Sequence, residues 1–351
     1  MKSHFRPAID ALAGYTPGEQ PKMDRLVKLN TNENPYPPSP RIAEALAAFA
    51  LENLHRYPDP TADALRDDIA ARCGVKRENV ICGNGSDDLL TMIFRAFTAP
   101  DRPVAVLDPS YSLYPVLAAM QEAPVIRMPL DPESFELKKP LAELARGANL
   151  VMLTRPNAPT GNSLPRDEVE SFCAGFDGIV AIDEAYADFA DDNCMEFAAK
   201  YDNVIVLRTF SKSYSLAGLR LGYAVGNAVL IDGLMKLKDS YNVDMLTQVV
   251  GRAAFADTKT LAAHTAAIRA TKARLTDELK KMGFTIIPSQ SNFIFAAPPD
   301  GDGERVFAEL RRHAVIVRYF PGKITGRFVR ITVGTDAEID RLLEVLKGND
   351  R

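Results

Sequence analysis

The chain has 351 residues, of which 46% are hydrophobic and 25% charged, and its formal net charge is -4. This balance is typical of a soluble globular protein with a substantial core, and the length favours two domains over one. The acidic balance argues against a general nucleic-acid surface, because binding to a phosphate backbone needs an excess of basic residues. No run approaches the roughly 18 apolar residues of a membrane span, and the first residues lack an apolar signal core.

The four cysteines are scattered without a CxxC spacing, and the four histidines form no pair of metal ligands. Neither a zinc site nor a disulfide framework is therefore predicted. We expect reduced cysteines, no metal and a cytoplasmic location.

Residues 1 to about 40 are predicted to form an extended arm, because the segment Asn30 to Pro40 is too rich in proline for a helix or a central strand. A helical pattern follows and stops at Tyr57 to Pro60. It resumes at Thr61, which is expected to cap the next helix, and Gly74 is expected to end that helix.

From residue 80 onward short apolar strands alternate with helices, which predicts an α/β fold with a mainly parallel sheet covered by helices on both faces. A helix is expected from Ser86, and helical patterns fill residues 228 to 282. Further strands after them indicate a smaller α+β domain. We therefore expect an N-terminal arm at 1–40, a large cofactor-binding domain at 41–250, and a small domain at 251–351 that packs with part of the arm. The expected strands are Val80 to Cys82, Val104 to Leu107, Val125 to Met128, Leu150 to Leu153, Ile179 to Ile182, Val204 to Leu207, Tyr223 to Val225, Phe284 to Ile287, Phe293 to Ala296, Val315 to Arg318 and Phe328 to Thr332.

The stretch that follows the strand Val204 to Leu207 places one lysine among hydroxyl groups and an arginine. Lys212 is suited to form an imine with the aldehyde of pyridoxal phosphate. Thr209, Ser211 and Arg220 have the donors to hold the phosphate of that cofactor. Taken alone, Lys212 could equally be a solvated loop lysine.

Asp183 ends the preceding strand, and Tyr186 follows one helical turn later. A carboxylate there suits the pyridinium nitrogen of the same cofactor, and a tyrosine hydroxyl can donate to its ring oxygen. Asp183 alone could be a helix cap, but its spacing from Lys212 and Tyr186 favours a shared role. Burial and a neighbouring cation are expected to lower the pKa of Lys212.

Ligands of such sheets lie beyond the carboxyl ends of the strands, so we expect one cleft to collect the polar residues that follow them. Gly83 to Asp87 lies between a strand and a helix, where free backbone N–H groups favour a phosphate, and its spacing is not the GxGxxG of a dinucleotide fold. Tyr111 could stack on a pyridine ring or be an ordinary core residue. Arg318 and Arg330 could form salt bridges or hold a carboxylate or phosphate.

Together these motifs resemble the fold type I aminotransferases that use pyridoxal phosphate, and among them the histidinol-phosphate aminotransferase family. The resemblance covers nearly the whole chain. The segments that carry it are Lys28 to Tyr36, Arg56 to Asp59, Gly83 to Asp87, Pro156 to Gly161, Asp183 to Tyr186, Thr209 to Arg220 and Val329 to Thr335.

The resemblance implies that Lys212, Asp183 and Tyr186 are the catalytic residues, and that the protein is a homodimer with its active site at the interface. It also implies cofactor contacts, with Tyr57 reaching the phosphate from the second subunit, and substrate contacts, with Arg330 at the carboxylate. The implied cofactor residues are Gly85, Ser86, Asp87, Tyr111, Asn157, Thr209, Ser211, Arg220 and Tyr57, and the implied substrate residues are Arg330, Arg318, Tyr15 and Asn34.

Two segments depart from the family pattern. Relatives usually have an asparagine directly before the proline of Pro-Thr-Gly, whereas Ala158 stands there and Asn157 precedes it. After Lys212 the chain has Ser213-Tyr214-Ser215 where an Ala-Phe-Gly type loop is common.

The function implied by the resemblance is amino-group transfer between glutamate and imidazole-acetol phosphate in histidine biosynthesis, with small molecules as partners and no membrane or nucleic acid. An aromatic amino-acid aminotransferase and a phosphothreonine decarboxylase of the same fold remain alternatives. A cofactor-binding regulator without turnover is disfavoured, because no DNA-binding segment or basic surface is evident. A dinucleotide-dependent oxidoreductase is the general α/β alternative.

Overall fold

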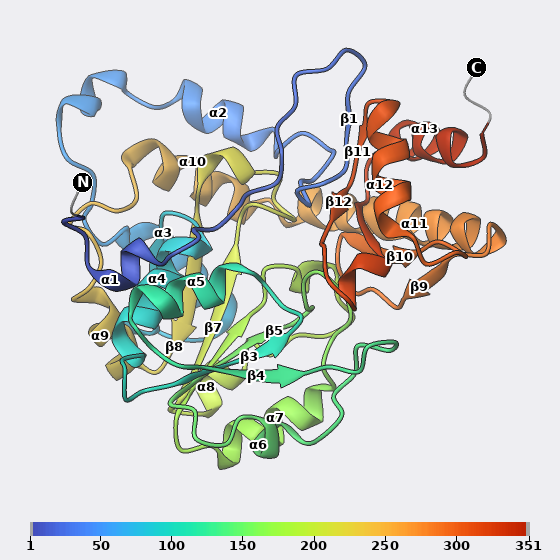
Figure 1. The fold of residues 1–351 in the computed structure, drawn as a ribbon. Coiled ribbons are helices and arrows are strands. Elements are labelled where there is room, and N and C mark those ends of the chain that lie inside the picture. Colours follow the sequence, from blue (N-terminus) through green and yellow to red (C-terminus); the bar gives the residue numbers. More distant parts are fainter. Residues whose placement is uncertain (1–2, 349–351) are drawn as a thin grey trace.

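The computed structural model describes residues 3–348, and its largest element is a seven-stranded sheet (Figure 1). Its strands are β2 (Val80–Gly83), β3 (Val104–Asp108), β4 (Val125–Pro129), β5 (Leu150–Thr154), β6 (Ile179–Asp183), β7 (Val204–Thr209) and β8 (Gly222–Gly226). The strand order is β2-β8-β7-β6-β5-β3-β4. Neighbouring strands from β4 to β7 are parallel, whereas β8 is antiparallel to both β7 and β2. The predicted mainly parallel α/β sheet is confirmed.

Helices cover both faces of this sheet, which is why its inner strands β5, β6 and β7 are apolar except at their carboxyl ends. Alternate residues of β7 face opposite layers: Val204 and Val206 belong to one core, and Ile205 and Leu207 belong to the other. The first layer is built from α2 (Arg41–Ala47), α3 (Asp63–Cys73), α6 (Leu141–Leu144), α7 (Arg166–Gly175), α8 (Phe197–Lys200) and α10 (Met245–Ala256). The second layer is built from α4 (Ser86–Phe97), α5 (Leu113–Met120) and α9 (Ala228–Met235).

A second, smaller unit lies on the C-terminal side of the chain and contains a four-stranded antiparallel sheet of order β12-β13-β10-β9 (Figure 1). Apolar side chains from this sheet and from three helices form a separate core. The smaller α+β domain is therefore confirmed. Its elements are β9 (Thr285–Ile287), β10 (Phe293–Ala297), β12 (Arg318–Tyr319), β13 (Val329–Thr332), α11 (Thr258–Lys281), α12 (Gly303–Arg312) and α13 (Asp336–Leu346).

The N-terminal arm is less uniformly extended than predicted. It contains a short helix, α1 (Pro7–Asp10), and a strand, β1 (Val27–Lys28), that pairs in parallel with β11 (Val315–Ile316). The strand predicted from Val315 to Arg318 is consequently divided, because β11 bonds the arm whereas β12 bonds β13. The division into 1–40, 41–250 and 251–351 stays a prediction, and residues 1–2 and 349–351 of it lie outside the described residues.

The predicted cap of α3 at Thr61 is wrong. The helix begins at Asp63 after Ala62, which has a φ of 54°. The carboxylate of Asp59 takes the capping role instead, because it accepts from the backbone N–H of Asp63 at 2.7 Å and from that of Thr61 at 3.0 Å. Gly74 ends the helix as predicted, with a φ of 68°.

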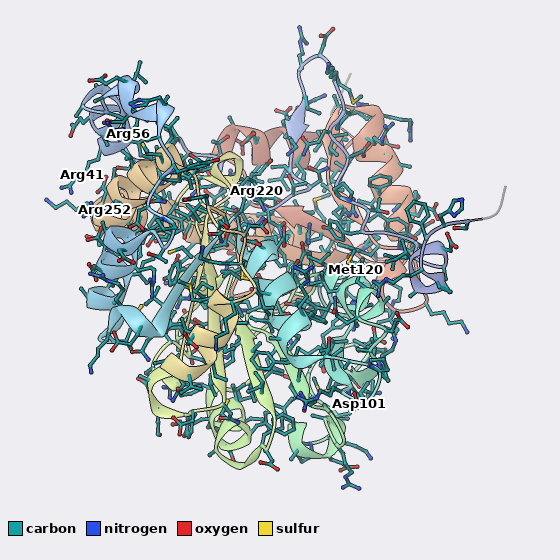
Figure 2. The ribbon with its side chains drawn as sticks, turned by 90° about the vertical axis from the view of Figure 1, so that its left-hand side faces the viewer. Arg41, Arg56, Asp101, Met120, Arg220 and Arg252 are labelled. Atoms are coloured by element: carbon teal, nitrogen blue, oxygen red, sulfur yellow. The ribbon has the colours of Figure 1, made fainter. Side chains whose placement is uncertain are left out.

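In the view of Figure 2, Arg41, Arg56 and Arg252 project at one outer edge, whereas Arg220 lies nearer the middle. Across residues 3–348, none of the helices has both the length and the apolar character needed to cross a membrane. The same residues contain no group of three or more His, Cys, Asp or Glu side chains arranged to hold a metal ion.

Candidate active site

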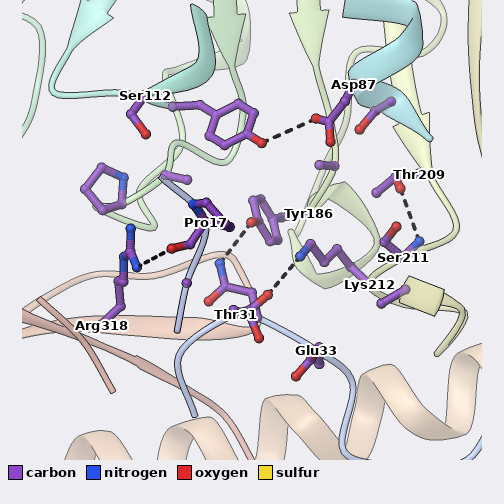
Figure 3. Close-up of a pocket in the computed structure, with 18 of the residues that line it drawn as sticks. Pro17, Thr31, Glu33, Asp87, Ser112, Tyr186, Thr209, Ser211, Lys212 and Arg318 are labelled. Carbon is purple, nitrogen blue, oxygen red and sulfur yellow. Dashed lines mark hydrogen bonds between the residues drawn. The ribbon is translucent and has the colours of Figure 1, made fainter. Parts of the chain in front are cut away.

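A cavity of about 290 Å³ lies beyond the carboxyl ends of the parallel strands, between the large sheet, the small sheet and the arm (Figure 3). The structure thus brings the polar segments that follow these strands into one cleft, as predicted. The predicted site residues that line it are Tyr15, Ser86, Asp87, Tyr111, Asp183, Tyr186, Thr209, Ser211, Lys212, Arg220, Arg318 and Arg330.

Lys212 extends into this cavity from the loop after β7 (Figure 3). Its Nζ donates to the backbone oxygen of Thr31 at 3.1 Å and lies 5.7 Å from the ring centroid of Tyr186. Burial and the nearby guanidinium of Arg330 lower the pKa of Lys212 to about 8. An appreciable fraction of the amine is therefore neutral near pH 7, which a nucleophile or a general base requires.

Asp183 is the last residue of β6 and is buried at the cavity wall. Its Oδ2 accepts from the hydroxyl of Tyr114 at 2.8 Å, and its Oδ1 accepts from the backbone N–H of Ala185 at 3.1 Å. Burial raises the pKa of Asp183 to about 6. The carboxylate is thus fixed in place and mostly ionised at neutral pH, ready to stabilise a cation beside it.

The N-terminus of α4 faces Arg220 and forms an anion-binding corner of the cavity. Gly85 precedes the helix with a φ of 81°, and a Cβ at this position would lie 2.5 Å from Nη2 of Arg220. Arg220 itself donates to Ser211 Oγ and to Asp87 Oδ2, each at 3.3 Å. Free helix N–H groups, a guanidinium and hydroxyls together favour a phosphate. The absence of a side chain at Gly85 leaves room for this close approach.

Two arginines line the cavity on the side of the small sheet. Arg330 donates from Nη2 to the backbone oxygen of Asn30 at 2.9 Å, and its carbon Cζ lies 5.2 Å from the ring centroids of both Phe293 and Phe320. Its buried Nε has no hydrogen-bond partner. Arg318 donates to two backbone oxygens of the arm. An unpartnered buried donor at a cavity wall is suited to an anionic ligand.

Four predicted site residues do not line this cavity. The side-chain amide of Asn157 is occupied by hydrogen bonds within the protein, because it donates to Pro109 O at 3.0 Å and to Thr160 Oγ1 at 2.9 Å. Its neighbour Ala158 lines the cavity instead. Asn34 donates to the backbone oxygen of Ser213. Gly85 lies next to the guanidinium of Arg220. Tyr57 is 77% exposed on the surface and stacks on Tyr241 with 4.3 Å between the ring centroids.

The structure also identifies polar contacts that were not predicted. Tyr114, which holds Asp183, lies one helical turn after Tyr111, and that spacing could have suggested it. Asn32 donates to the hydroxyl of Tyr186 at 2.9 Å, and Thr31 accepts from Lys212. Both belong to the asparagine-rich segment of the arm, whose composition indicated an irregular loop but not its partners.

The fold and this cavity define an enzyme of the transaminase class. A model of the family "aminotransferase class I and II" matches residues 24–346, and the chain belongs to that family.

More particular similarities are found among individual proteins. The chain is 42% identical to histidinol-phosphate aminotransferase 1 of Bordetella parapertussis, with 99% of each chain covered. It is 44% identical to histidinol-phosphate aminotransferase 2 of Thiobacillus denitrificans, with 98% of this chain and 97% of the relative covered. The crystal structure of histidinol-phosphate aminotransferase from Sinorhizobium meliloti in complex with pyridoxal-5'-phosphate superposes with a TM-score of 0.89, at 26% identity over 100% of this chain and 99% of that one.

Proposed function

We propose that the protein transfers an amino group between glutamate and imidazole-acetol phosphate, giving 2-oxoglutarate and histidinol phosphate, with pyridoxal phosphate as cofactor. The observation that carries this proposal is that Lys212, Asp183 and Arg330 line one cavity together with the N-terminus of α4. When bound, pyridoxal phosphate supplies an electron sink that stabilises negative charge on the carbon next to the transferred nitrogen.

The residues present fit this cofactor. The corner formed by Ser86, Ser211 and Arg220 would hold the phosphate with backbone N–H, hydroxyl and guanidinium donors. At the other end of the ring, the carboxylate of Asp183 would keep the ring nitrogen protonated, and the hydroxyl of Tyr186 would donate to the ring oxygen.

Lys212 would carry two tasks in the reaction. Its neutral amine would condense with the cofactor aldehyde with loss of water. Once displaced by the amine of the substrate, it would move a proton between the substrate carbon that bears the nitrogen and the former aldehyde carbon. Both tasks need an amine that loses its proton near neutral pH, and burial of Lys212 beside Arg330 supports them because it lowers the pKa to about 8.

The two amino-group partners carry different anions, namely a carboxylate on glutamate and a phosphate ester on histidinol phosphate. Arginine accepts both, because its planar guanidinium offers paired donors to either group. Arg330 would hold the carboxylate with its free Nε, and Arg318 and Tyr15 would lie near the distal end of the substrate. Asn34 and Asn157 do not line the cavity, so they would support its wall through their hydrogen bonds to Ser213, Pro109 and Thr160.

We also propose that the protein is a homodimer in which Tyr57 reaches the phosphate in the partner's cavity. Large apolar side chains are exposed along this segment, with Leu51 at 69%, Leu54 at 49% and Tyr57 at 77%. Arg56, directly before Tyr57, projects at the outer edge of the molecule (Figure 2). Such a patch is typical of a protein interface. Light scattering at micromolar concentration should give twice the mass of 38.5 kDa, and a monomer would contradict this proposal.

The proposed substrate can be tested with the cofactor-loaded protein and one amino donor at a time. We expect histidinol phosphate to remove the visible absorbance of the bound cofactor in a single turnover, at least about 10²-fold faster than phenylalanine, because a site built to bind a polar or charged group rejects an analogue that lacks it. Equal rates would favour an aromatic aminotransferase. Release of carbon dioxide from phosphothreonine without an oxo-acid acceptor would favour the phosphothreonine decarboxylase.

Arg330→Ala is the variant that ties this activity to the cavity. Because Arg330 is proposed to bind the anionic group of either substrate, the variant should slow the half-reaction with glutamate as well as the half-reaction with histidinol phosphate. Full rates in both half-reactions would show that the anions bind elsewhere.

A further inference from the structure

The hydroxyl of Tyr186 stands at the end of a chain of hydrogen bonds that begins in the backbone of the arm. The backbone N–H of Asn32 donates to the hydroxyl oxygen of Thr332 at 3.0 Å. The Thr332 hydroxyl donates to Oδ1 of Asn32 at 3.0 Å, and Nδ2 of Asn32 donates to the Tyr186 hydroxyl at 2.9 Å. All three side chains are buried.

The direction of this chain follows from the chemistry of its first member. A backbone N–H can only donate, so the Thr332 oxygen accepts there and its own proton is directed to Asn32. If the Asn32 amide were flipped, Nδ2 would face Thr332 and the Thr332 proton would lose its acceptor in a buried place, which is unfavourable. Oδ1 therefore faces Thr332, and Nδ2 faces Tyr186.

The backbone and the ring are also held in place. Asn32 has a φ of 55°, a left-handed conformation that asparagine adopts more readily than most residues, and its backbone oxygen accepts from Nδ2 of Asn292 at 3.0 Å. The rings of Tyr186 and Phe293 pack in a T-shaped arrangement, with 5.1 Å between centroids. Because the Tyr186 oxygen already accepts from Asn32, its single proton is free to point into the cavity.

We propose that Asn32 and Thr332 are positioning residues that direct the Tyr186 O–H toward the anionic ring oxygen of pyridoxal phosphate. The inference rests on the proposed function of the cavity. No amide of the loop before Pro159 is free to share this task, because Ala158 has no polar side chain and the Asn157 amide donates to Pro109 and Thr160. The direction of one hydroxyl proton thus depends on a threonine of the small sheet.

The test titrates the absorbance band of the bound cofactor against pH. Tyr186→Phe should raise the apparent pKa of that band by about 1 to 2 pH units, because an anionic oxygen without its donor holds the neighbouring proton more tightly. Asn32→Asp is nearly isosteric but presents an acceptor to Tyr186, so the Tyr186 proton should turn away from the cavity and the pKa should rise in the same way.

The double variant separates positioning from the added charge. Asn32→Asp should shift the pKa of the band clearly more in the protein with Tyr186 than in the Tyr186→Phe background. Equal shifts in the two backgrounds would show that Asn32 acts by charge alone and would overturn the inference.

Thr332 offers a matched pair of substitutions for the same titration. Thr332→Val removes the hydroxyl and should raise the pKa of the band in the direction of Tyr186→Phe, whereas Thr332→Ser keeps the hydroxyl and should leave it unchanged. No difference between valine and serine would contradict a role for Thr332. If the unmodified protein shows no absorbance band from a cofactor attached to residue 212, the proposed function itself fails. That outcome is distinct from a band that forms but whose pKa is the same in all these variants, which would contradict the further inference alone.

Discussion

Replacing Lys212 by alanine should lower the rate of amino-group transfer by about 10⁴-fold, the upper part of the range for a positioned acid–base group. Among the described residues that line the cavity, Lys212 is the single lysine, so no other amine there can take its place. The measurement is the single-turnover rate, together with borohydride reduction and peptide mapping. We expect an adduct at residue 212 in the unmodified protein and none in the variant.

Lys212→Arg is the control, because it keeps a positive charge near the backbone oxygen of Thr31 but has no titratable amine. It should be as inactive as the alanine variant. An active arginine variant, or an adduct at another residue, would contradict the assignment.

The pH dependence of cofactor attachment to Lys212 has a defined sign. The neutral amine reacts, so attachment should accelerate as pH rises and level off above about 8, where burial and Arg330 place the pKa of Lys212. Since Arg330 lowers this pKa, Arg330→Ala should move the midpoint to higher pH. A midpoint near the ordinary lysine value of 10.5 would show that Lys212 is not buried in solution.

Features encoded locally in the chain were the ones that could be predicted. Apolar runs such as Ile179 to Ile182 mark buried strands, and the polar residue that ends each run marks the edge where ligands bind. Lys212, Asp183 and Tyr186 each follow such a run, which is why their position at that edge of the sheet could be predicted before the structure was known.

Contacts between distant segments could not be predicted in the same way. Arg330 and Asn30 are 300 residues apart, and the contact uses a backbone oxygen, which every residue possesses. Lys212 likewise bonds a backbone oxygen, that of Thr31, which lies 181 residues away in the chain. The wrong cap at Thr61 has a related cause, because Asp59 and Thr61 both carry suitable acceptors and only the backbone path selects between them.

Asp183→Asn should slow the half-reaction by about 10² to 10³-fold, the loss found when one fixed electrostatic partner of a developing charge is removed. Asparagine keeps the shape but has one acceptor oxygen instead of two. It can keep the bond from the Ala185 N–H, while its amide nitrogen faces the Tyr114 hydroxyl, whose proton can turn to Thr154 Oγ1. The measurement is the single-turnover rate with the cofactor at saturation. An unchanged rate would mean that no cation lies beside this carboxylate.

Tyr114→Phe separates the charge of Asp183 from its hydrogen bond. The variant keeps the carboxylate, so at pH 8 its rate should fall by about 10- to 100-fold, the value of one hydrogen bond to a charged group. Burial raises the pKa of Asp183 to about 6, and the Tyr114 hydroxyl opposes that rise. Without the hydroxyl the carboxylate accepts a proton at higher pH, so cofactor binding should weaken on acidification sooner in Tyr114→Phe than in the unmodified protein. If cofactor binding in Tyr114→Phe instead weakened at a lower pH than in the unmodified protein, the role assigned to the buried carboxylate would be contradicted.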